Sequence, residues 1–314
     1  MGKDNNTPTD ENNAAVNALD STLEKPVPAP RAAATNALIV AGKRFEEIKV
    51  VSTGGGAAGI ACLNMLLTLG VERENVWLCD LAGLVYHGRT EQMTDQKAAY
   101  AQGTEAKSLA DVIDGADLFL GLSGPGVLSA EMVAKMAPRP IIFALANPTP
   151  EILPDQVRAV VPDAIMATGR SDFPNQVNNV LCFPFIFRGA LDVGATQIND
   201  EMQIACIEGI AALARATTSA EAAAAYRGEK LTFGTDYLIP KPFDPRLIGV
   251  VATAVAKAAM ESGVATRPLA DIAAYKQKLD GSVFKSAMLM RPVFEAAATA
   301  TRKIVFAEGE DERV

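Results

Sequence analysis

Short apolar runs alternate with longer stretches of mixed apolar and polar residues through the first half of the chain. The runs are rich in β-branched residues and too short for helices, which predicts strands buried on both faces. They lie at 48–53, 75–80, 116–122, 140–146 and 164–168. Helices are predicted at 32–40, from 57 onward, and at 91–102, 129–136 and 151–160, with a loop at 81–89. This alternation predicts an α/β fold, a doubly wound parallel sheet with helices on both faces.

The starts of two predicted helices carry local signals. Ser108 and Asp111 stand three residues apart before a helical stretch, which is the spacing of a capping box. Thr149 and Pro150 suit the N-cap and the first turn of the predicted helix 151–160. Both signals support the helices expected from the apolar pattern.

The alternation stops near residue 183, beyond which the chain is mainly helical. Helices are predicted at 183–191, 199–215, 220–226, 246–261 and 282–300, the last broken or kinked at Pro292. The proline-rich segment 237–245 predicts an extended connector. Residues 302–309 predict a single new strand, which we interpret as the start of a further domain that has been cut away.

Composition and charge exclude several classes of function. The 314 residues are 49% hydrophobic and carry a formal net charge of -8, which argues against broad binding to nucleic-acid phosphates. No apolar stretch is long enough to cross a membrane, and the N-terminus lacks the apolar core of a signal peptide. Four cysteines without C-x-x-C spacing favour buried reduced thiols. We therefore expect a soluble, cytoplasmic protein whose partners include neither nucleic acid nor membrane.

A glycine-rich turn directly after the first predicted strand is the most specific motif. Gly54, Gly56 and Gly59 have the spacing G-x-G-x-x-G, and residues that suit a helix follow from Ala57. In a dinucleotide-binding fold, the first glycine allows the tight turn, the second lets backbone approach a pyrophosphate, and the third lets the helix pack on the strand. The pyrophosphate would lie on the free N–H groups of the helix start. A tight βα turn without a ligand is the alternative.

An acidic residue follows the second predicted strand. Asp80 lies roughly 20 residues beyond the last glycine, where such folds place a carboxylate that binds the ribose. Together with the strand before the glycines and the helix after them, it favours nucleotide binding over a bare turn. A P-loop is excluded, because Ile60 follows Gly59 in place of the required lysine.

Further polar residues follow the later predicted strands. Because ligands of open parallel sheets bind outside the carboxyl ends of the strands, Ser123 and Asn147 can share one crevice with the glycine turn. The amide of Asn147 could bind a carboxylate or carboxamide, or only form an Asx turn. Asn178 and Asn179 precede an apolar helix, where they could bind a ligand or cap that helix. The single histidine, His87, fits a solvated loop better than a base or metal ligand.

Taken in order, these motifs resemble the nucleotide domain of bacterial malic enzymes over about residues 32–286. The likeness rests on residues 54–60, 80, 83–85, 88–89, 121–123, 144–149, 176–179 and 183–191. The sequence most resembles the large hybrid type, in which a phosphotransacetylase-like domain follows. We accordingly expect a disordered tail at 1–30, an NAD(P)-binding Rossmann domain at 31–245, a helical segment at 246–301, and the truncated start of the phosphotransacetylase-like domain at 302–314.

The resemblance implies a cofactor site that adjoins a substrate site. The residues that would contact the cofactor are Gly54, Gly55, Gly56, Ala57, Ala58, Gly59, Asp80, Arg89, Ser123, Asn147 and Asn179. Asn147 and Asn179 would also bind the malate carboxylates. Members of this type favour NADP, with NAD as the other candidate. Because Asp80 would repel a 2′-phosphate, a neighbouring cation must offset it; Arg89 is our candidate, and a solvated loop arginine is the alternative.

Intact malic enzymes also carry an upstream tyrosine, lysine and metal-binding acids, and this sequence lacks that stretch. The resemblance therefore implies the cofactor- and substrate-binding portion of an enzyme that oxidises malate to pyruvate and CO2 with NADP, inactive on its own. For the intact enzyme it implies Mg2+ or Mn2+ and a homo-oligomer. A non-catalytic nucleotide-binding or regulatory module is the alternative. An amino-acid dehydrogenase is disfavoured, because Asn147 and Asn179 accompany the glycine turn.

Overall fold

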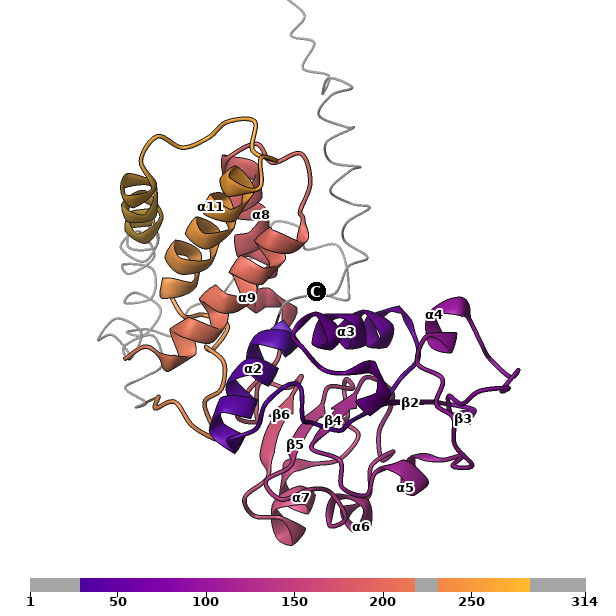
Figure 1. Cartoon of the computed structure of the whole chain (residues 1–314). Coiled ribbons are helices and arrows are strands. Elements are labelled where there is room, and N and C mark those ends of the chain that lie inside the picture. Colours follow the sequence, from indigo (N-terminus) through magenta and orange to yellow (C-terminus); the bar gives the residue numbers. More distant parts are fainter. Residues whose placement is uncertain (1–28, 218–230, 283–314) are drawn as a thin grey trace, which may run out of the picture.

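The centre of the molecule is a six-stranded sheet with the strand order β3-β2-β1-β4-β5-β6 (Figure 1). The computed structural model describes residues 29–217 and 231–282. The strands are β1 (Val50–Thr53), β2 (Val76–Asp80), β3 (Gly83–Leu84), β4 (Leu118–Gly121), β5 (Ile141–Ala144) and β6 (Ile165–Thr168). All neighbouring strands are parallel except β2 and β3, which are antiparallel. The predicted doubly wound sheet is therefore confirmed.

Side chains of the strands alternate between two apolar layers, one on each face of the sheet. In β4, Leu118 and Leu120 belong to one buried cluster while Phe119 belongs to the other. The first face is covered by α2 (Ala29–Ala41) and α3 (Ala57–Thr68). The second face is covered by α5 (Leu109–Val112), α6 (Ala130–Val133) and α7 (Pro154–Val160). The central strands are buried along their whole length, as their continuous apolar runs predicted.

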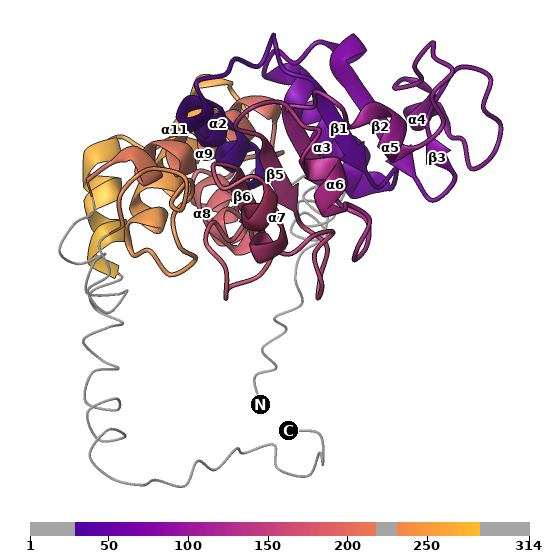
Figure 2. The ribbon, with the colours of Figure 1, turned by 90° about the horizontal axis from the view of Figure 1, so that it is seen from below.

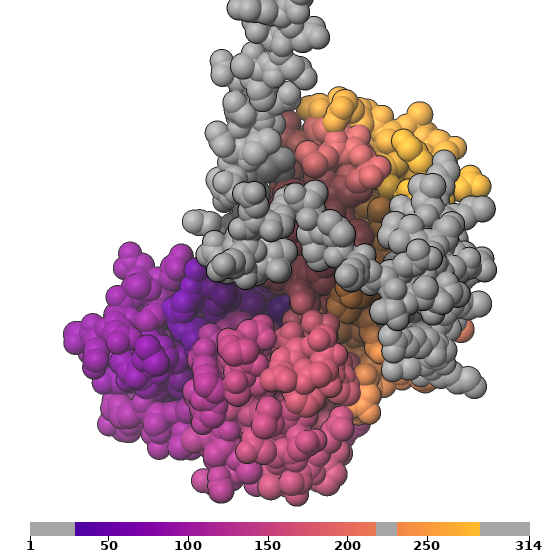
Figure 3. Space-filling model, turned by 180° about the vertical axis from the view of Figure 1, so that it is seen from behind, coloured from indigo at the N-terminus to yellow at the C-terminus, as the bar shows by residue number. Residues whose placement is uncertain are grey.

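A second group of helices packs beside the sheet and forms the other lobe of the molecule (Figures 2 and 3). These are α8 (Phe183–Asp192), α9 (Asp200–Arg215) and α11 (Thr253–Glu261), with a π-helical turn, η3 (Ile248–Ala252), leading into α11. A short 3-10 helix, η2 (Asn179–Leu181), precedes α8, and another, η1 (Arg73–Asn75), precedes β2. Predicted helices 183–191, 199–215 and 246–261 are thus confirmed, and one apolar cluster joins them to α2 and α3.

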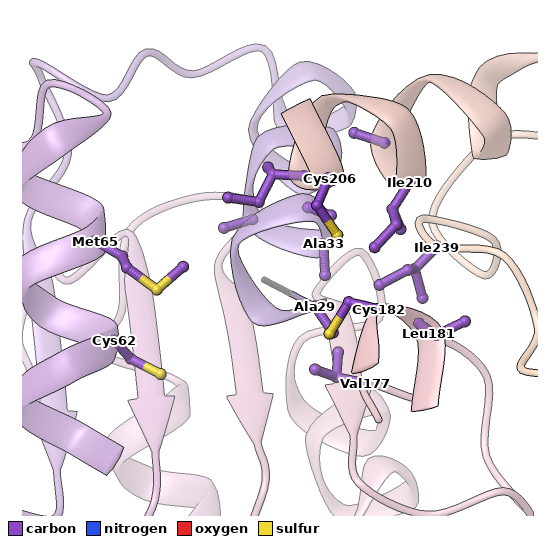
Figure 4. Close-up of a cluster of buried hydrophobic side chains, with 14 of the residues drawn as sticks. Ala29, Ala33, Cys62, Met65, Val177, Leu181, Cys182, Cys206, Ile210 and Ile239 are labelled. Atoms are coloured by element: carbon purple, nitrogen blue, oxygen red, sulfur yellow. The ribbon is translucent and has the colours of Figure 1, made fainter. Parts of the chain in front are cut away.

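Helix α2 connects the two lobes, because it contacts both the sheet and α9. In the buried cluster, Ala33 of α2 lies beside Cys206 of α9, and Ala29 lies beside Cys182 (Figure 4). The buried side chain of Asn36 donates hydrogen bonds to backbone carbonyls of α9 and of the segment after it, at 3.0 and 2.7 Å. Small residues and one satisfied amide therefore hold the lobes together.

Several predicted boundaries were wrong. Helix α2 begins at Ala29, so the last residues of the predicted tail 1–30 are helical. The predicted loop 81–89 contains the edge strand β3, because the chain turns back at Gly83, which has a φ of 95°. Residues 272–282 form a helix that we did not predict. The predictions for 1–28, 220–226, 283–300 and 302–314 lie outside the described residues.

Three predicted helices are shorter than expected. The prediction 91–102 is reduced to α4 (Asp95–Ala98), and 129–136 is reduced to α6. Helix α7 begins at Pro154, so Thr149 and Pro150 do not start it. The capping box of Ser108 and Asp111 is present at the start of α5. All four cysteines are free and buried, as predicted. Within the described ranges, no helix is long and apolar enough to span a bilayer.

Candidate functional site

The glycine turn joins β1 to α3, and its three glycines have different surroundings. Gly54 has a φ of 107°, and a Cβ there would lie 2.3 Å from the Leu122 carbonyl oxygen. A Cβ on Gly59 would come within 1.8 Å of the Gly54 carbonyl oxygen. A Cβ on Gly56 would meet no atom within 4 Å, so this glycine borders open space. The turn thus has one exposed backbone segment between two tightly packed positions.

Helix α3 starts at this turn without a side-chain cap. Its N-cap is Gly56, which has no side chain to accept the first N–H groups. Those N–H groups have no partner inside a helix, and the helix dipole adds positive potential at the same end. The 12 residues of α3 therefore point an anion-binding end at the open space beside Gly56.

A groove of about 460 Å³ runs along the carboxyl ends of β1 and β2. The residues that line it are Thr53, Gly54, Gly55, Gly56, Cys79, Asp80, Leu81, Gly83, Gln92, Lys97, Ser108, Leu109, Ser123 and Val127. They include the glycine turn, Asp80 and Ser123, which the sequence predicted to share one crevice. Its apolar lining includes Leu81, which is 98% exposed.

Asp80, at the end of β2, is held by two cations. Arg89 donates from one guanidinium nitrogen to both carboxylate oxygens, at 2.6 and 2.8 Å. Lys97 donates to Oδ2 at 2.7 Å. Burial by itself raises the pKa of Asp80, but the hydrogen bonds from Lys97, Arg89 and the Ala82 N–H, together with the charge of Arg89, lower it below its usual range. Two positive charges against one negative charge leave this corner of the groove cationic.

Arg89 and Lys97 differ in their hydrogen-bond partners and in their exposure to the groove. The Arg89 guanidinium also donates to the carbonyl oxygens of Glu91, Gly83 and Leu84 at 3.0 Å each, and its side chain is only 3% exposed. Arg89 therefore holds the β2–β3 turn and does not present a free guanidinium to a ligand, nor is it a solvated loop residue. Lys97 lines the groove and uses two of its three donors, on Asp80 and the Gln92 carbonyl.

Sequence reasoning missed Lys97 as a candidate. It lies within the predicted helix 91–102, where a lysine usually faces solvent, and no spacing rule connects it to the glycine turn. The structure places its side chain against the turn, because a Cβ on Gly55 would lie 2.7 Å from Lys97 Cε. The one available signal was its position as a cation soon after Asp80.

Asn147, Asn178 and Asn179 do not line this groove, although the sequence predicted that Asn147 would share it. Asn147 follows β5 and is exposed, and its amide lies beside Gly169, the residue after β6, where a Cβ would be 2.8 Å from Nδ2. The Asn178 side chain accepts a hydrogen bond from the Val180 N–H at 3.0 Å and caps η2. Asn179 is exposed, and its amide makes no hydrogen bond within the described residues. Asn178 thus uses its amide oxygen as a cap, whereas the exposed amide of Asn179 keeps both its oxygen and its NH2 group for a ligand.

Comparisons with known proteins agree with this arrangement. The family model "Malic enzyme, NAD binding domain" matches residues 30–226. The chain is 60% identical over 284 residues to an NAD-dependent malic enzyme of Rhizobium meliloti (strain 1021), and 56% identical over 284 residues to an NADP-dependent malic enzyme of Escherichia coli (strain K12). Each match covers 90% of this chain and 37% of the relative.

The fold is also that of solved malic enzymes. A crystal structure of malic enzyme from Entamoeba histolytica matches with a TM-score of 0.72 and 31% identity, covering 88% of this chain and 56% of that one. The malic enzyme of Pyrococcus horikoshii matches with a TM-score of 0.69 and 32% identity, covering 86% and 60%. With its glycine turn, cationic corner and matched sequence, the chain belongs to the malic enzyme family and carries that family's NAD(P)-binding domain.

Proposed function

We propose that the groove binds NADP, with the 2′-phosphate beside Lys97, the pyrophosphate at the start of α3, and the nicotinamide toward Asn147 and Asn179. In a protein of the relatives' full length, this site would serve the oxidative decarboxylation of malate to pyruvate and CO2. The chain spans 37% of the length of the curated relatives described above. We therefore propose this reaction for a protein of their full length.

The cationic corner is the observation that carries the choice of NADP. A bare carboxylate at the end of the second strand would repel a 2′-phosphate. Here Asp80 is already neutralised by Arg89, and Lys97 adds a second positive charge with one unused donor. A phosphate next to Lys97 would gain a charge-assisted hydrogen bond.

The nicotinamide end follows from the order of the strands. The dinucleotide crosses the sheet edge where the strand order reverses, between β1 and β4. Its adenosine half lies over β2, so its nicotinamide half lies over β4 and β5, next to Asn147. The exposed amides of Asn147 and Asn179 offer donors and acceptors for a carboxamide or a malate carboxylate. NADP bound there would accept the hydride that malate loses.

A divalent metal does not fit the residues described. Within 29–217 and 231–282, no three side chains of histidine, cysteine, aspartate or glutamate lie close enough together to hold a metal ion. Mg2+ and Mn2+ prefer several oxygen ligands. We therefore assign no metal ligand and no metal-dependent step to this part of the chain.

The test is calorimetric titration of the chain with NADP and with NAD, before and after Lys97→Met. Methionine keeps much of the volume of lysine but removes the charge and the donors. We expect NADP affinity to fall roughly tenfold to a hundredfold, because a hydrogen bond to a charged group is worth about 1.5–3 kcal/mol. NAD affinity should change less than threefold.

Lys278→Met is the matched control, since Lys278 is an exposed lysine in the helix 272–282. It should leave both affinities unchanged. No saturable binding of either dinucleotide to the folded wild-type chain would overturn the proposed site. An equal loss for NADP and NAD in Lys97→Met would overturn the role of Lys97 in choosing between them.

A further inference from the structure

Glu151 is a fully buried glutamate behind the carboxyl ends of β4 and β5. Its relative exposure is 0%, and no cation pairs with it among the described residues. A buried carboxylate is costly unless hydrogen-bond donors satisfy it. The hydrogen-bond donors around Glu151 therefore indicate which parts of the fold it holds together.

Backbone N–H groups from two different loops satisfy the carboxylate. The Ser123 N–H, in the loop after β4, donates to Oε1 at 2.9 Å. The Ala146 N–H, in the loop after β5, donates to Oε2 at 3.1 Å. One carboxylate thus joins the loop that carries Ser123 to the residue directly before Asn147.

The network continues to the strand that leads into the glycine turn. Ser123 Oγ lies 3.3 Å from Glu151 Oε1 and 2.8 Å from Thr53 Oγ1. Thr53 is the last residue of β1 and precedes Gly54. The carboxyl ends of β1, β4 and β5 are therefore connected through one glutamate and two hydroxyl groups.

The strand beside Glu151 leaves room for this carboxylate. A Cβ on Gly121, the last residue of β4, would lie 2.4 Å from the Glu151 carboxyl carbon. Glu151 lies before α7, which begins at Pro154. The proline fixes that start, because the residue before a proline disfavours helical backbone, and Leu153 is extended.

We propose that Glu151 is a positioning residue for the nicotinamide half of the cofactor. It fixes the Ser123 loop and the Asn147 loop relative to the glycine turn without touching the ligand. This inference rests on the proposed NADP site. Because Glu151 lies under β4 and β5 while Asp80 and Lys97 lie at the β2 side, we expect it to affect the nicotinamide half more than the adenosine half.

Glutamine cannot replace glutamate here. Both carboxylate oxygens accept from backbone N–H groups, whereas an amide has one acceptor oxygen and one NH2 donor. In Glu151→Gln, the NH2 group would face an N–H of one loop, donor against donor. That loop would lose its hydrogen bond while the size of the side chain is kept.

The experiment compares the affinities of wild type and Glu151→Gln for NADP and for 2′,5′-ADP, which contains only the adenosine half with its 2′-phosphate. We expect NADP affinity to fall about tenfold and 2′,5′-ADP affinity to stay within twofold. A loss of general stability would weaken both ligands alike. Glu72→Gln, an exposed glutamate before η1, is the matched control and should change neither affinity.

The outcomes separate this inference from the proposed function. Wild-type protein that binds neither ligand would refute the proposed site itself. Wild-type binding of both, with Glu151→Gln changing neither or weakening both equally, would refute only the role of Glu151. If Glu151→Gln does not fold, hydrogen exchange of the wild-type amides tests the role of Glu151 instead. The Ser123 and Ala146 N–H groups should then be strongly protected, and exchange at exposed-loop rates would overturn the inference.

Discussion

At the scale of single residues, the glycines of the turn have two different roles: one borders the proposed ligand site, and the others are needed for folding. Gly56 borders open space, whereas a side chain on Gly54 or Gly59 would collide with backbone. The sequence motif assigned a role to each of these glycines, and the geometry agrees for Gly54, whose positive φ makes the turn. Gly59 packs against the Gly54 carbonyl, so it keeps the helix close to its own turn.

We predict that Gly56→Asp abolishes NADP binding and leaves the unfolding temperature almost unchanged. Its side chain would place negative charge where the pyrophosphate lies, but it would meet no protein atom. Gly59→Ala should instead lower the unfolding temperature, because its Cβ would overlap the Gly54 carbonyl oxygen. Calorimetric titration and thermal unfolding of both variants test this. Gly56→Asp that binds NADP like wild type would contradict it.

The sequence predicted those residues whose role depends on local backbone geometry. Gly54, Gly56 and Asp80 follow fixed spacings within one βα unit, so their pattern is visible in the chain itself. Lys97 and Glu151 were not predicted, because their roles depend on which distant groups the fold brings to them. Lys97 meets Asp80 from 17 residues away, and Glu151 meets Ser123 from 28 residues away.

At the scale of elements, strands were predicted better than helices. Each central strand is one apolar run buried on both faces, which leaves little choice of position. Helices α4 and α7 were predicted too long, each because of a different backbone feature. Gln92 has a φ of 52°, which is incompatible with a helix, and its carbonyl accepts from Lys97 at 2.7 Å. For α7, Pro154 sets the start, because the residue before a proline disfavours helical backbone.

The helix 272–282 is attached to α8 by a hydrogen bond that can be tested. The Tyr275 hydroxyl donates to Asp192 Oδ2 at 2.7 Å, and Arg188 pairs with the same carboxylate. We predict that Tyr275→Phe lowers the free energy of unfolding by about 1–2 kcal/mol, because the acceptor is charged but partly exposed. Urea unfolding measures it.

Tyr86→Phe provides the matched control, since the Tyr86 hydroxyl makes no hydrogen bond within the described residues. It should change the free energy of unfolding by less than about 0.5 kcal/mol. Equal losses in the two variants would mean that the Tyr275 hydroxyl does not attach the helix 272–282 to α8.

At the scale of the whole molecule, the described part places the proposed cofactor groove in one of two lobes, and the chain spans 37% of the length of the curated relatives described above. The sheet, α3 and α4 supply the groove, and α2 joins this lobe to the helices α8, α9 and α11. The described residues contain no cluster of three metal-ligating side chains. Cofactor binding and malate oxidation should therefore be separable.

We predict that this chain binds NADP but does not reduce it when malate and Mn2+ are added. The absorbance of reduced nicotinamide is followed with the same sample in which calorimetry has shown NADP binding. That titration controls for loss of the folded groove. A sustained metal-dependent rate from the chain alone would contradict this prediction.

The placement of Lys97 on α4 bears on how cofactor preference could evolve. Helix α4 has only four residues and lies outside the two apolar layers that hold the sheet. Asp80, by contrast, is anchored by Arg89, whose other bonds fix the β2–β3 turn. Under the proposed role of Lys97, a lineage could exchange one dinucleotide for the other by altering this peripheral helix. The core would need no compensating substitutions, so selection on the cofactor could act almost independently of selection on the fold.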